Sequence, residues 1–382
     1  MLHASRLIFA TEFFIGLSVS LAKKSPFVPL CQRGNSACDE HFPSLKKRGQ
    51  GRFWTRVSYS IALTIFLSNA AGFAAQEKLA NVTIAYTSIS PQYAPVWIAK
   101  EAGFFKKNGI NAQLVYMRGG VVATQALVSN DVNFINAGGG GVVDAVLGGA
   151  DIFIVASPIN QEPQVLVTKR EIKDLAQLKG KKLAVNSLIG PAMLSLKMIL
   201  AASGLDPERD VSYLAVGPSS SRFGALQLNQ VDATTLAPPF TFAARRAGYN
   251  FFEDLPGMRD SELPNAALTT SRKFYDAEPF ATEMVIKSVI EGIHFYKTEN
   301  IKTPMIMKKY MKLENTEELQ EAYSFYVKLL AEKPYPSAKG IQTILDWSKR
   351  LDARKANPAQ FIQTKVIEKL DKQGFIDGLY TR

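Results

Sequence analysis

Short runs of β-branched and aromatic residues alternate with segments of helical periodicity over most of the chain after residue 80. Residues of the Gly, Ser, Pro and Asn types separate these segments. The runs predict strands at 82–87, 112–117, 132–137, 152–157, 182–186, 211–216 and 231–236. Such alternation is typical of βαβ units, in which a parallel sheet is covered by helices. After Ser271 the pattern is almost entirely helical, so the chain is predicted to be α/β with a helical C-terminal part.

The alternating pattern starts again near Leu175, which predicts two successive α/β units, the second smaller than the first. Open parallel sheets bind ligands beyond the C-terminal ends of their strands. Helix N-termini at that edge present unpaired N–H groups and a partial positive charge. Two such units facing one another would therefore enclose a cleft for a small polar or anionic ligand.

Residues 52–75 have the features of a signal peptide. Arg52 and Arg56 precede a short apolar stretch, and small residues follow at cleavage spacing up to Ala75. An uncleaved membrane anchor is the alternative, although the apolar stretch is short for a bilayer span. We expect the protein to be exported to the periplasm.

Residues 1–51 show no sustained hydrophobic period after about residue 22. They form either an extension of unknown role or a sequence that precedes the true start of translation, and we favour the second interpretation.

Charge and cysteine content exclude several classes of function. The net charge of +11 falls to about +5 once residues 1–75 are set aside, and no basic run interleaved with aromatics follows, so nucleic-acid binding is not expected. Both cysteines, Cys31 and Cys38, lie in the N-terminal segment, and His294 is the single histidine after residue 75. We therefore expect no disulfide framework, no metal site, no cofactor and no catalytic residue in the main body.

Five motifs follow one another in the order found in a known family. The first contains Ala99-Lys-Glu101 followed by Gly103-Phe-Phe105 and Gly109, and the others lie at 127–134, 174–185, 226–233 and 373–380. Together they resemble the periplasmic solute-binding proteins for nitrate, sulfonate and taurine, whose superfamily includes thiamine-pyrimidine synthase. Asn130 and Asn133 replace the Gly and Asp usual in the second motif.

The resemblance implies a two-lobed type II periplasmic binding fold, each lobe a mostly parallel sheet flanked by helices. It places lobe one at 76–165 and 265–382, lobe two at 166–264, and two crossover strands between them. It also implies a non-catalytic solute-binding component of an ABC importer, with a small-molecule ligand and a membrane permease as partners. A thiamine-pyrimidine-synthase-like enzyme is the alternative, although that chemistry relies on a cysteine-rich loop and a donor histidine.

Candidate ligand-binding residues lie in loops that follow predicted strands. The loop after the first strand precedes a helix, so its hydroxyl and amide groups could contact a ligand or simply cap that helix. Arg118 could pair with an anionic group. The glycines of the later loops would let backbone approach a ligand closely. The candidates are Ser88, Ser90, Gln92, Tyr93, Arg118, Gly138, Gly139, Asn160, Gln161, Ser187, Gly190 and Pro238.

Overall fold

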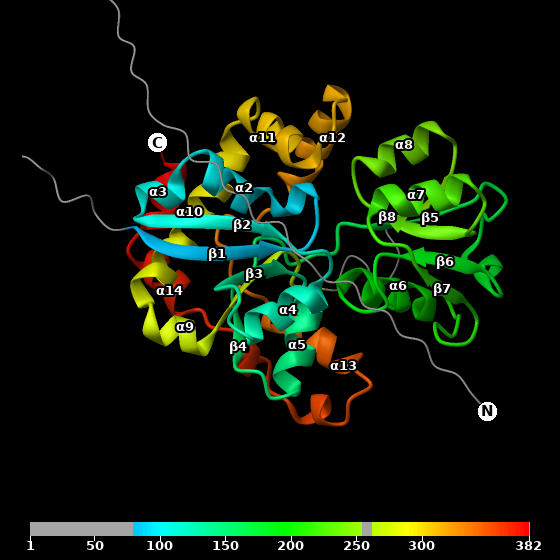
Figure 1. Ribbon diagram of the computed structural model, residues 1–382. Coiled ribbons are helices and arrows are strands. Elements are labelled where there is room, and N and C mark those ends of the chain that lie inside the picture. The colour runs from blue at the N-terminus through cyan, green and yellow to red at the C-terminus, as the bar shows by residue number, and fades with distance from the viewer. Residues whose placement is uncertain (1–78, 254–261, 382) are drawn as a thin grey trace, which may run out of the picture. The chain divides into compact units, whose positions relative to one another are not determined.

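The computed structural model describes residues 79–253 and 262–381, and these contain two five-stranded sheets with helices packed against them (Figure 1). The predicted signal peptide at 52–75 and the segment 1–51 lie outside the described residues. The strands are β1 (Ala80–Tyr86), β2 (Ile110–Tyr116), β3 (Phe134–Ala137), β4 (Ile152–Ala156), β5 (Val165–Thr168), β6 (Lys182–Val185), β7 (Ser212–Ala215), β8 (Ala233–Leu236), β9 (Asn250–Phe252) and β10 (Ala267–Ser271).

Both sheets have the same strand order. Sheet one runs β2-β1-β3-β10-β4 and sheet two runs β7-β6-β8-β5-β9. In each, three neighbouring strands are parallel, and the fourth strand in the order pairs antiparallel with both of its neighbours. We call the part built on sheet one lobe one, and the part built on sheet two lobe two.

The antiparallel strand of each sheet is the one that enters from the other lobe. The chain leaves sheet one after β4 and enters sheet two as β5, and it leaves sheet two after β9 and re-enters sheet one as β10. The two connecting segments are hydrogen-bonded to each other, since Leu263 N donates to Asn160 O at 2.8 Å and Asn265 N donates to Ile159 O at 2.8 Å. The two connecting segments are therefore held side by side where the chain passes between the sheets.

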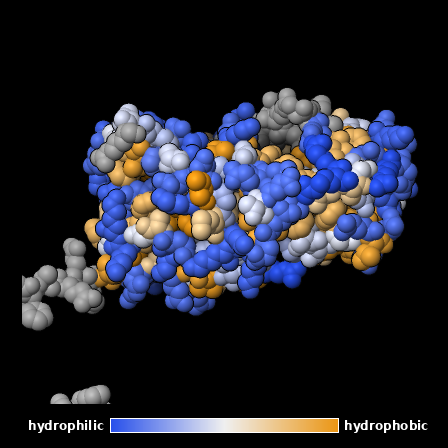
Figure 2. Space-filling model, turned by 90° about the horizontal axis from the view of Figure 1, so that it is seen from above, coloured by the Kyte–Doolittle hydropathy of each residue, from blue (hydrophilic) through white to orange (hydrophobic). Residues whose placement is uncertain are grey.

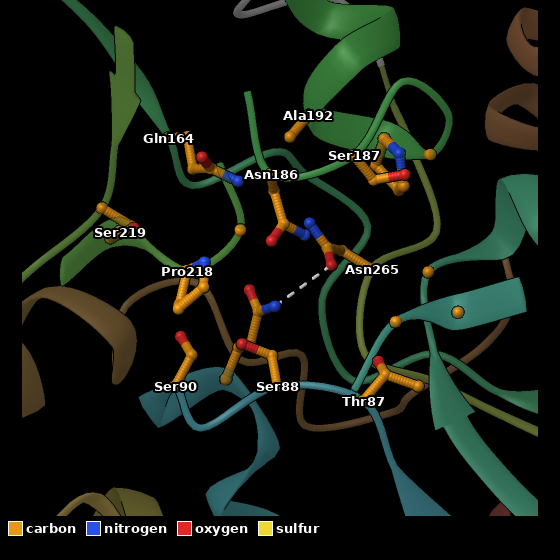
Figure 3. Close-up of a pocket in the computed structure, with 18 of the residues that line it drawn as sticks. Thr87, Ser88, Ser90, Gln164, Asn186, Ser187, Ala192, Pro218, Ser219 and Asn265 are labelled. Atoms are coloured by element: carbon orange, nitrogen blue, oxygen red, sulfur yellow. Dashed lines mark hydrogen bonds between the residues drawn. The ribbon is translucent and has the colours of Figure 1, made fainter. Parts of the chain in front are cut away.

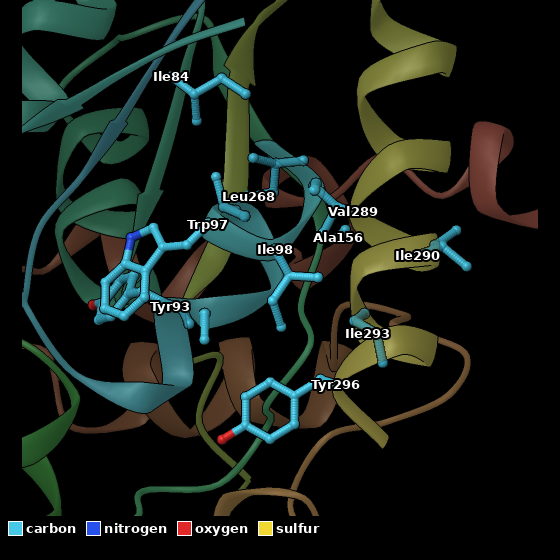
Figure 4. Close-up of a cluster of buried hydrophobic side chains, with 14 of the residues drawn as sticks. Ile84, Tyr93, Trp97, Ile98, Ala156, Leu268, Val289, Ile290, Ile293 and Tyr296 are labelled. Atoms are coloured by element: carbon cyan, nitrogen blue, oxygen red, sulfur yellow. The ribbon is translucent and has the colours of Figure 1, made fainter. Parts of the chain in front are cut away.

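Side-chain alternation along the strands buries both faces of each sheet, because successive residues of a strand point to opposite faces. In β1, Val82 and Ile84 join one apolar cluster and Ala85 joins another. In β5, Leu166 and Val167 are divided in the same way between two clusters of lobe two. Figure 4 shows the larger lobe-one cluster, where Trp97 and Ile98 lie between the sheet and a long helix that carries Val289 and Ile293.

Helices connect the strands and form the C-terminal part of the chain after β10. They are α2 (Ala94–Glu101), α3 (Phe104–Lys107), α4 (Gly120–Val128), α5 (Gly139–Leu147), α6 (Pro191–Ala202), α7 (Ser219–Gln227), α8 (Phe240–Arg246), α9 (Arg272–Ala277), α10 (Pro279–Thr298), α11 (Lys302–Met311), α12 (Thr316–Tyr326), α13 (Ala338–Asp346), α14 (Lys365–Lys372) and α15 (Phe375–Tyr380). Short 3-10 helices are η1 (Pro91–Tyr93), η2 (Leu175–Leu178), η3 (Asp352–Lys355) and η4 (Pro358–Phe361). None of the helices in the described ranges is both long and apolar enough to span a bilayer.

The predicted α/β architecture is confirmed, and the seven strands expected from the hydrophobic pattern are present within a few residues of their predicted bounds. The pattern alone missed β5, β9 and β10. These strands have three to five residues and pair antiparallel or at a sheet edge. They were not predicted because they are not part of the regular alternation of strand and helix.

Candidate functional site

A cavity of about 410 Å³ lies where loops from both lobes meet. Its lining includes the loops that follow β1, β2 and β3 of lobe one and those that follow β6, β7 and β8 of lobe two. Residues 162–164 and Asn265 of the two crossover segments also line it, as does Tyr326 at the end of α12. Figure 3 shows side chains from both lobes, among them Ser88, Asn186 and Asn265, around one open space. The strand-end loops therefore share one cavity, as parallel-sheet topology predicts.

Glycines allow the loops of the two lobes to approach one another across this cavity. A Cβ added to Gly138 would lie 2.7 Å from Pro191 Cδ, which is closer than ordinary van der Waals contact. A Cβ added to Gly217 would collide with Arg118 Nη2, and Gly217 also has a φ of +100°. A larger side chain at Gly138 would therefore push the two walls of the cavity apart, whereas one at Gly217 would displace the Arg118 guanidinium and strain the backbone.

The four regular helices that begin at the cavity lack side-chain caps. Gly119, Gly138, Gly190 and Pro218 are the N-cap residues of α4, α5, α6 and α7, and none of them makes a side-chain capping bond. By contrast, Asn315 accepts a capping hydrogen bond at the start of α12. The cavity therefore faces helix ends that favour an anionic or hydrogen-bond-accepting group.

The sequence left open whether the Ser90 hydroxyl only caps the helix that follows β1, and the structure shows that it does not. Ser90 is the N-cap residue of η1 and makes no side-chain capping bond. Its Oγ lies 3.4 Å from the hydroxyl of Tyr326, while Thr87 Oγ1 lies 3.1 Å from the hydroxyl of Tyr93. Burial raises the pKa of both tyrosines, so their hydroxyl groups stay neutral and can donate or accept hydrogen bonds.

A chain of hydrogen bonds among lining residues connects the lobes. Gln92 Nε2 donates to Asn265 Oδ1 at 3.3 Å, and Asn265 Nδ2 donates to Glu162 Oε2 at 3.0 Å. The backbone N–H of Gln164 donates to Glu162 Oε1 at 3.2 Å. The side-chain oxygen of Gln164 in turn accepts from Arg222 Nη2 at 2.6 Å. Residues of η1, both crossover segments and α7 are thus joined in a single polar network.

Glu162 is the acidic residue among those that line the cavity. Burial raises its pKa to about 7, although the hydrogen bonds from Gln164 and the charge of Arg222 act in the opposite direction. A carboxyl group with this pKa exists in both protonation states near neutral pH.

Arg222 is only 1% exposed, and its guanidinium is occupied by protein acceptors. Its Nε and Nη2 donate to Thr235 O at 3.0 and 2.8 Å, Nη1 donates to Gly217 O, and Nη2 also reaches Ser219 Oγ at 3.1 Å. Burial lowers the pKa of Arg222 to about 10, so it remains charged at neutral pH. This arginine joins the loop after β7 to strand β8. Its bonds to protein acceptors occupy the groups that would otherwise bind a ligand.

Arg118 differs from Arg222, because its side chain is exposed at the cavity wall. Within the described residues, no carboxylate oxygen lies within ion-pair distance of it. Its charge is therefore open to an anionic group.

Eight of the predicted site residues line the cavity, namely Ser88, Ser90, Gln92, Tyr93, Arg118, Gly138, Ser187 and Gly190. The other four, Gly139, Asn160, Gln161 and Pro238, are outside its lining. Asn160 Nδ2 donates to Tyr335 O at 2.9 Å, and Gly139 N donates to Pro264 O at 2.9 Å, so both residues make contacts that tie the crossover segments to lobe one. Contact of any of the twelve with a ligand remains a prediction.

Sequence reasoning missed Glu162, Gln164, Arg222 and Asn265. A signal was present for two of them, because Glu162 and Gln164 flank Pro163 just after the predicted hinge residues. For Arg222 a weaker signal was its place in the first turn of a helix, where a positive charge opposes the helix dipole unless it has other partners.

Comparisons with known proteins agree with this architecture. Residues 75–307 match the model of the NMT1-like family. YtlA of Bacillus subtilis, whose name proposes a binding role without a ligand, is 28% identical over 167 residues. That match spans 42% of this chain and 50% of YtlA, so only half the length of this relative is covered.

Two solved structures show the same fold. The periplasmic aliphatic sulphonate binding protein SsuA of Escherichia coli superposes with a TM-score of 0.60 at 20% identity, covering 74% of this chain and 92% of SsuA. The periplasmic nitrate-binding protein NrtA of Synechocystis superposes with a TM-score of 0.63 at 14% identity, covering 78% of this chain and 89% of NrtA. The chain therefore has the periplasmic binding protein fold and belongs to the NMT1-like family.

Proposed function

We propose that this protein is the extracytoplasmic solute-binding component of an ABC importer. It captures a small organic or anionic ligand of the sulfonate, taurine, nitrate or pyrimidine-like kind in the cavity between its lobes and delivers it to a membrane permease. The observation that carries the proposal is the shared cavity, in which strand-end loops of both lobes and both crossover segments meet. The names of SsuA and NrtA, a sulphonate-binding and a nitrate-binding protein, support a solute-binding role.

Ligand contact is proposed for the eight predicted residues that line the cavity. The uncapped helix ends and Arg118 favour an acceptor or anionic group, while the hydroxyl and amide side chains of the loop after β1 would orient the ligand. The lobes would close on the ligand about the two crossover segments.

Binding rather than catalysis is favoured by the side chains that line the cavity. They include no histidine and no cysteine, the two groups on which thiamine-pyrimidine-synthase-like chemistry relies. A thiamine-pyrimidine-synthase-like enzyme remains the alternative, and turnover of a bound ligand would distinguish it.

Location in the periplasm rests on the predicted signal peptide at 52–75. Cell fractionation combined with N-terminal sequencing of the mature protein tests it. A new N-terminus near Ala75 in the periplasmic fraction is expected, whereas an intact chain in the membrane fraction would support the anchor alternative.

Calorimetric titration of the purified protein with taurine, alkanesulfonates, nitrate and pyrimidines tests the binding role. A ligand at one hundred times its Kd should stabilise the protein by about 2.7 kcal/mol. Gly138→Ala should weaken that binding at least tenfold, because the new Cβ would press on Pro191. Gly224→Ala is the matched control, since a Cβ there has open space. Catalytic turnover without tight binding would contradict the proposal.

A further inference from the structure

The charged side chains that line the cavity differ in exposure. Arg118 is exposed, whereas Glu162 is partly buried and belongs to the polar network of the cavity lining. Arg222 does not form an ion pair with Glu162 and donates instead to Gln164, Ser219 and two backbone carbonyls. The Glu162 carboxylate is thus a partly buried charged group of the cavity lining that has no ion-pair partner among the described residues.

Glu162 has acceptor capacity to spare. An ionised carboxylate offers about four lone-pair sites, and Glu162 receives hydrogen bonds from Gln164 N, from Asn265 Nδ2 and from the side-chain amide of Gln164, which leaves about one site free. A partly buried carboxylate with an unused site is costly unless a donor completes it. An anionic ligand group placed beside it would be repelled.

A second acceptor in the lining, Gln92 Oε1, has no hydrogen-bond partner within the described residues. Ala266 N donates to Asn265 Oδ1 and Glu162 accepts from Asn265 Nδ2, so the orientation of the Asn265 amide is fixed from both sides. Gln92 must then direct its Nε2 toward Asn265 Oδ1, which leaves Gln92 Oε1 as a buried acceptor with no hydrogen-bond partner in the described chain. The part of the lining formed by Gln92 and Glu162 therefore needs hydrogen-bond donors.

We propose that Glu162 is the specificity-determining residue of this cavity and that it receives an N–H-bearing group of the ligand, such as an ammonium, amidinium or amino-substituted ring. Simple anions such as nitrate or an unsubstituted alkanesulfonate are then poor ligands. The inference rests on the proposed binding function and narrows its ligand class. An acceptor group on the same ligand would meet the helix ends and Arg118.

Pairs of probes that differ by one amino group test the inference. Taurine is compared with propane-1-sulfonate, and 4-aminopyrimidine with 4-methylpyrimidine, by calorimetric titration at pH 8. In at least one pair the amino member should bind tenfold or more tightly than its methyl counterpart. Glu162→Gln should remove that preference. Glu171→Gln, at an exposed position outside the cavity, should keep it.

Equal or tighter binding of propane-1-sulfonate or nitrate, unchanged or improved by Glu162→Gln, would overturn the role of Glu162 while leaving the binding function intact. Absence of binding by every probe, together with absence of a co-purified ligand in native mass spectrometry, would contradict both proposals. A co-purified ligand without an N–H group would overturn the specificity assignment alone. Thermal unfolding of both variants confirms that they are folded when titrated.

Discussion

The two lobes share one strand order but are stabilised by different kinds of side chain. The larger cluster of lobe one contains Trp97, Tyr296 and Tyr326, all fully buried, and extends into the C-terminal helices. The clusters of lobe two contain mainly aliphatic side chains, and the largest fully buried side chain of that lobe is the charged Arg222. On the one face shown in Figure 2 the surface is mainly hydrophilic, with small scattered groups of apolar residues.

Because of this difference, we expect the state of the cavity to affect the stability of lobe two more than that of lobe one. Apolar burial stabilises lobe one whether or not the cavity is occupied. In lobe two, Arg222 joins strand β8 to the loop after β7, and that loop lines the cavity. Changes in the cavity are therefore expected to alter the stability of lobe two, while lobe one should respond little.

The largest effect is expected from Trp97→Ala in lobe one. The indole is 0% exposed and stacks on Tyr310 with ring centroids 4.8 Å apart. Removing it should lower the free energy of unfolding by about 3–5 kcal/mol. Trp347, 38% exposed, gives the control Trp347→Ala, which should cost less than about 1 kcal/mol. Similar losses in chemical denaturation of the two variants would refute the importance of the aromatic core.

Glu162, between the lobes, should make stability depend on pH. Its folded pKa of about 7 lies above the ordinary value of 4.5, so the folded protein holds the proton more tightly than the unfolded chain. Stability should therefore fall as pH rises from about 4.5 to 7, by up to about 3 kcal/mol. The charged or titratable groups coupled to this carboxyl are Arg222, Tyr93 and Tyr326, none of which titrates in that window.

Denaturation of wild type and Glu162→Gln between pH 5 and pH 8 measures this contribution. The difference in stability between the two proteins should move in favour of the variant as pH rises. A constant difference across the range would show that the carboxyl group is not desolvated.

Arg222→Met tests the polar stabilisation of lobe two. The variant leaves the carbonyl groups of Gly217 and Thr235 without their buried donor, at a cost of about 2 kcal/mol. Hydrogen exchange should accelerate in α7 and β8 and stay unchanged in β1. Arg209→Met is the control, because that side chain is 87% exposed. Faster exchange in both lobes would show that Arg222 does not stabilise lobe two specifically.

Hydrophobic periodicity predicted most of the fold because the parallel strands and their helices bury regular apolar faces. It also placed eight candidate residues at the cavity, since Ser88, Arg118 and Ser187 follow recognisable strands. It could not identify Glu162 or Asn265, whose position depends on two crossover segments that are over one hundred residues apart and pair only in the folded chain. The guanidinium of Arg222 gave no reliable signal because its partners are mainly backbone carbonyls.

The smallest effect is expected from one of the ion pairs that join the lobes, the pair between Arg246 and Glu318. Arg246 of α8 lies 2.8 Å from Glu318 of α12, and its side chain is 49% exposed. Arg246→Ala should change stability by less than about 1 kcal/mol and weaken ligand binding by about threefold at low salt, with the difference vanishing at high salt. Arg245→Ala is the matched control, because Arg245 pairs with Glu253 inside lobe two. An equal loss of affinity in both variants, measured by calorimetry at two salt concentrations, would show that the contact between the lobes does not contribute to binding.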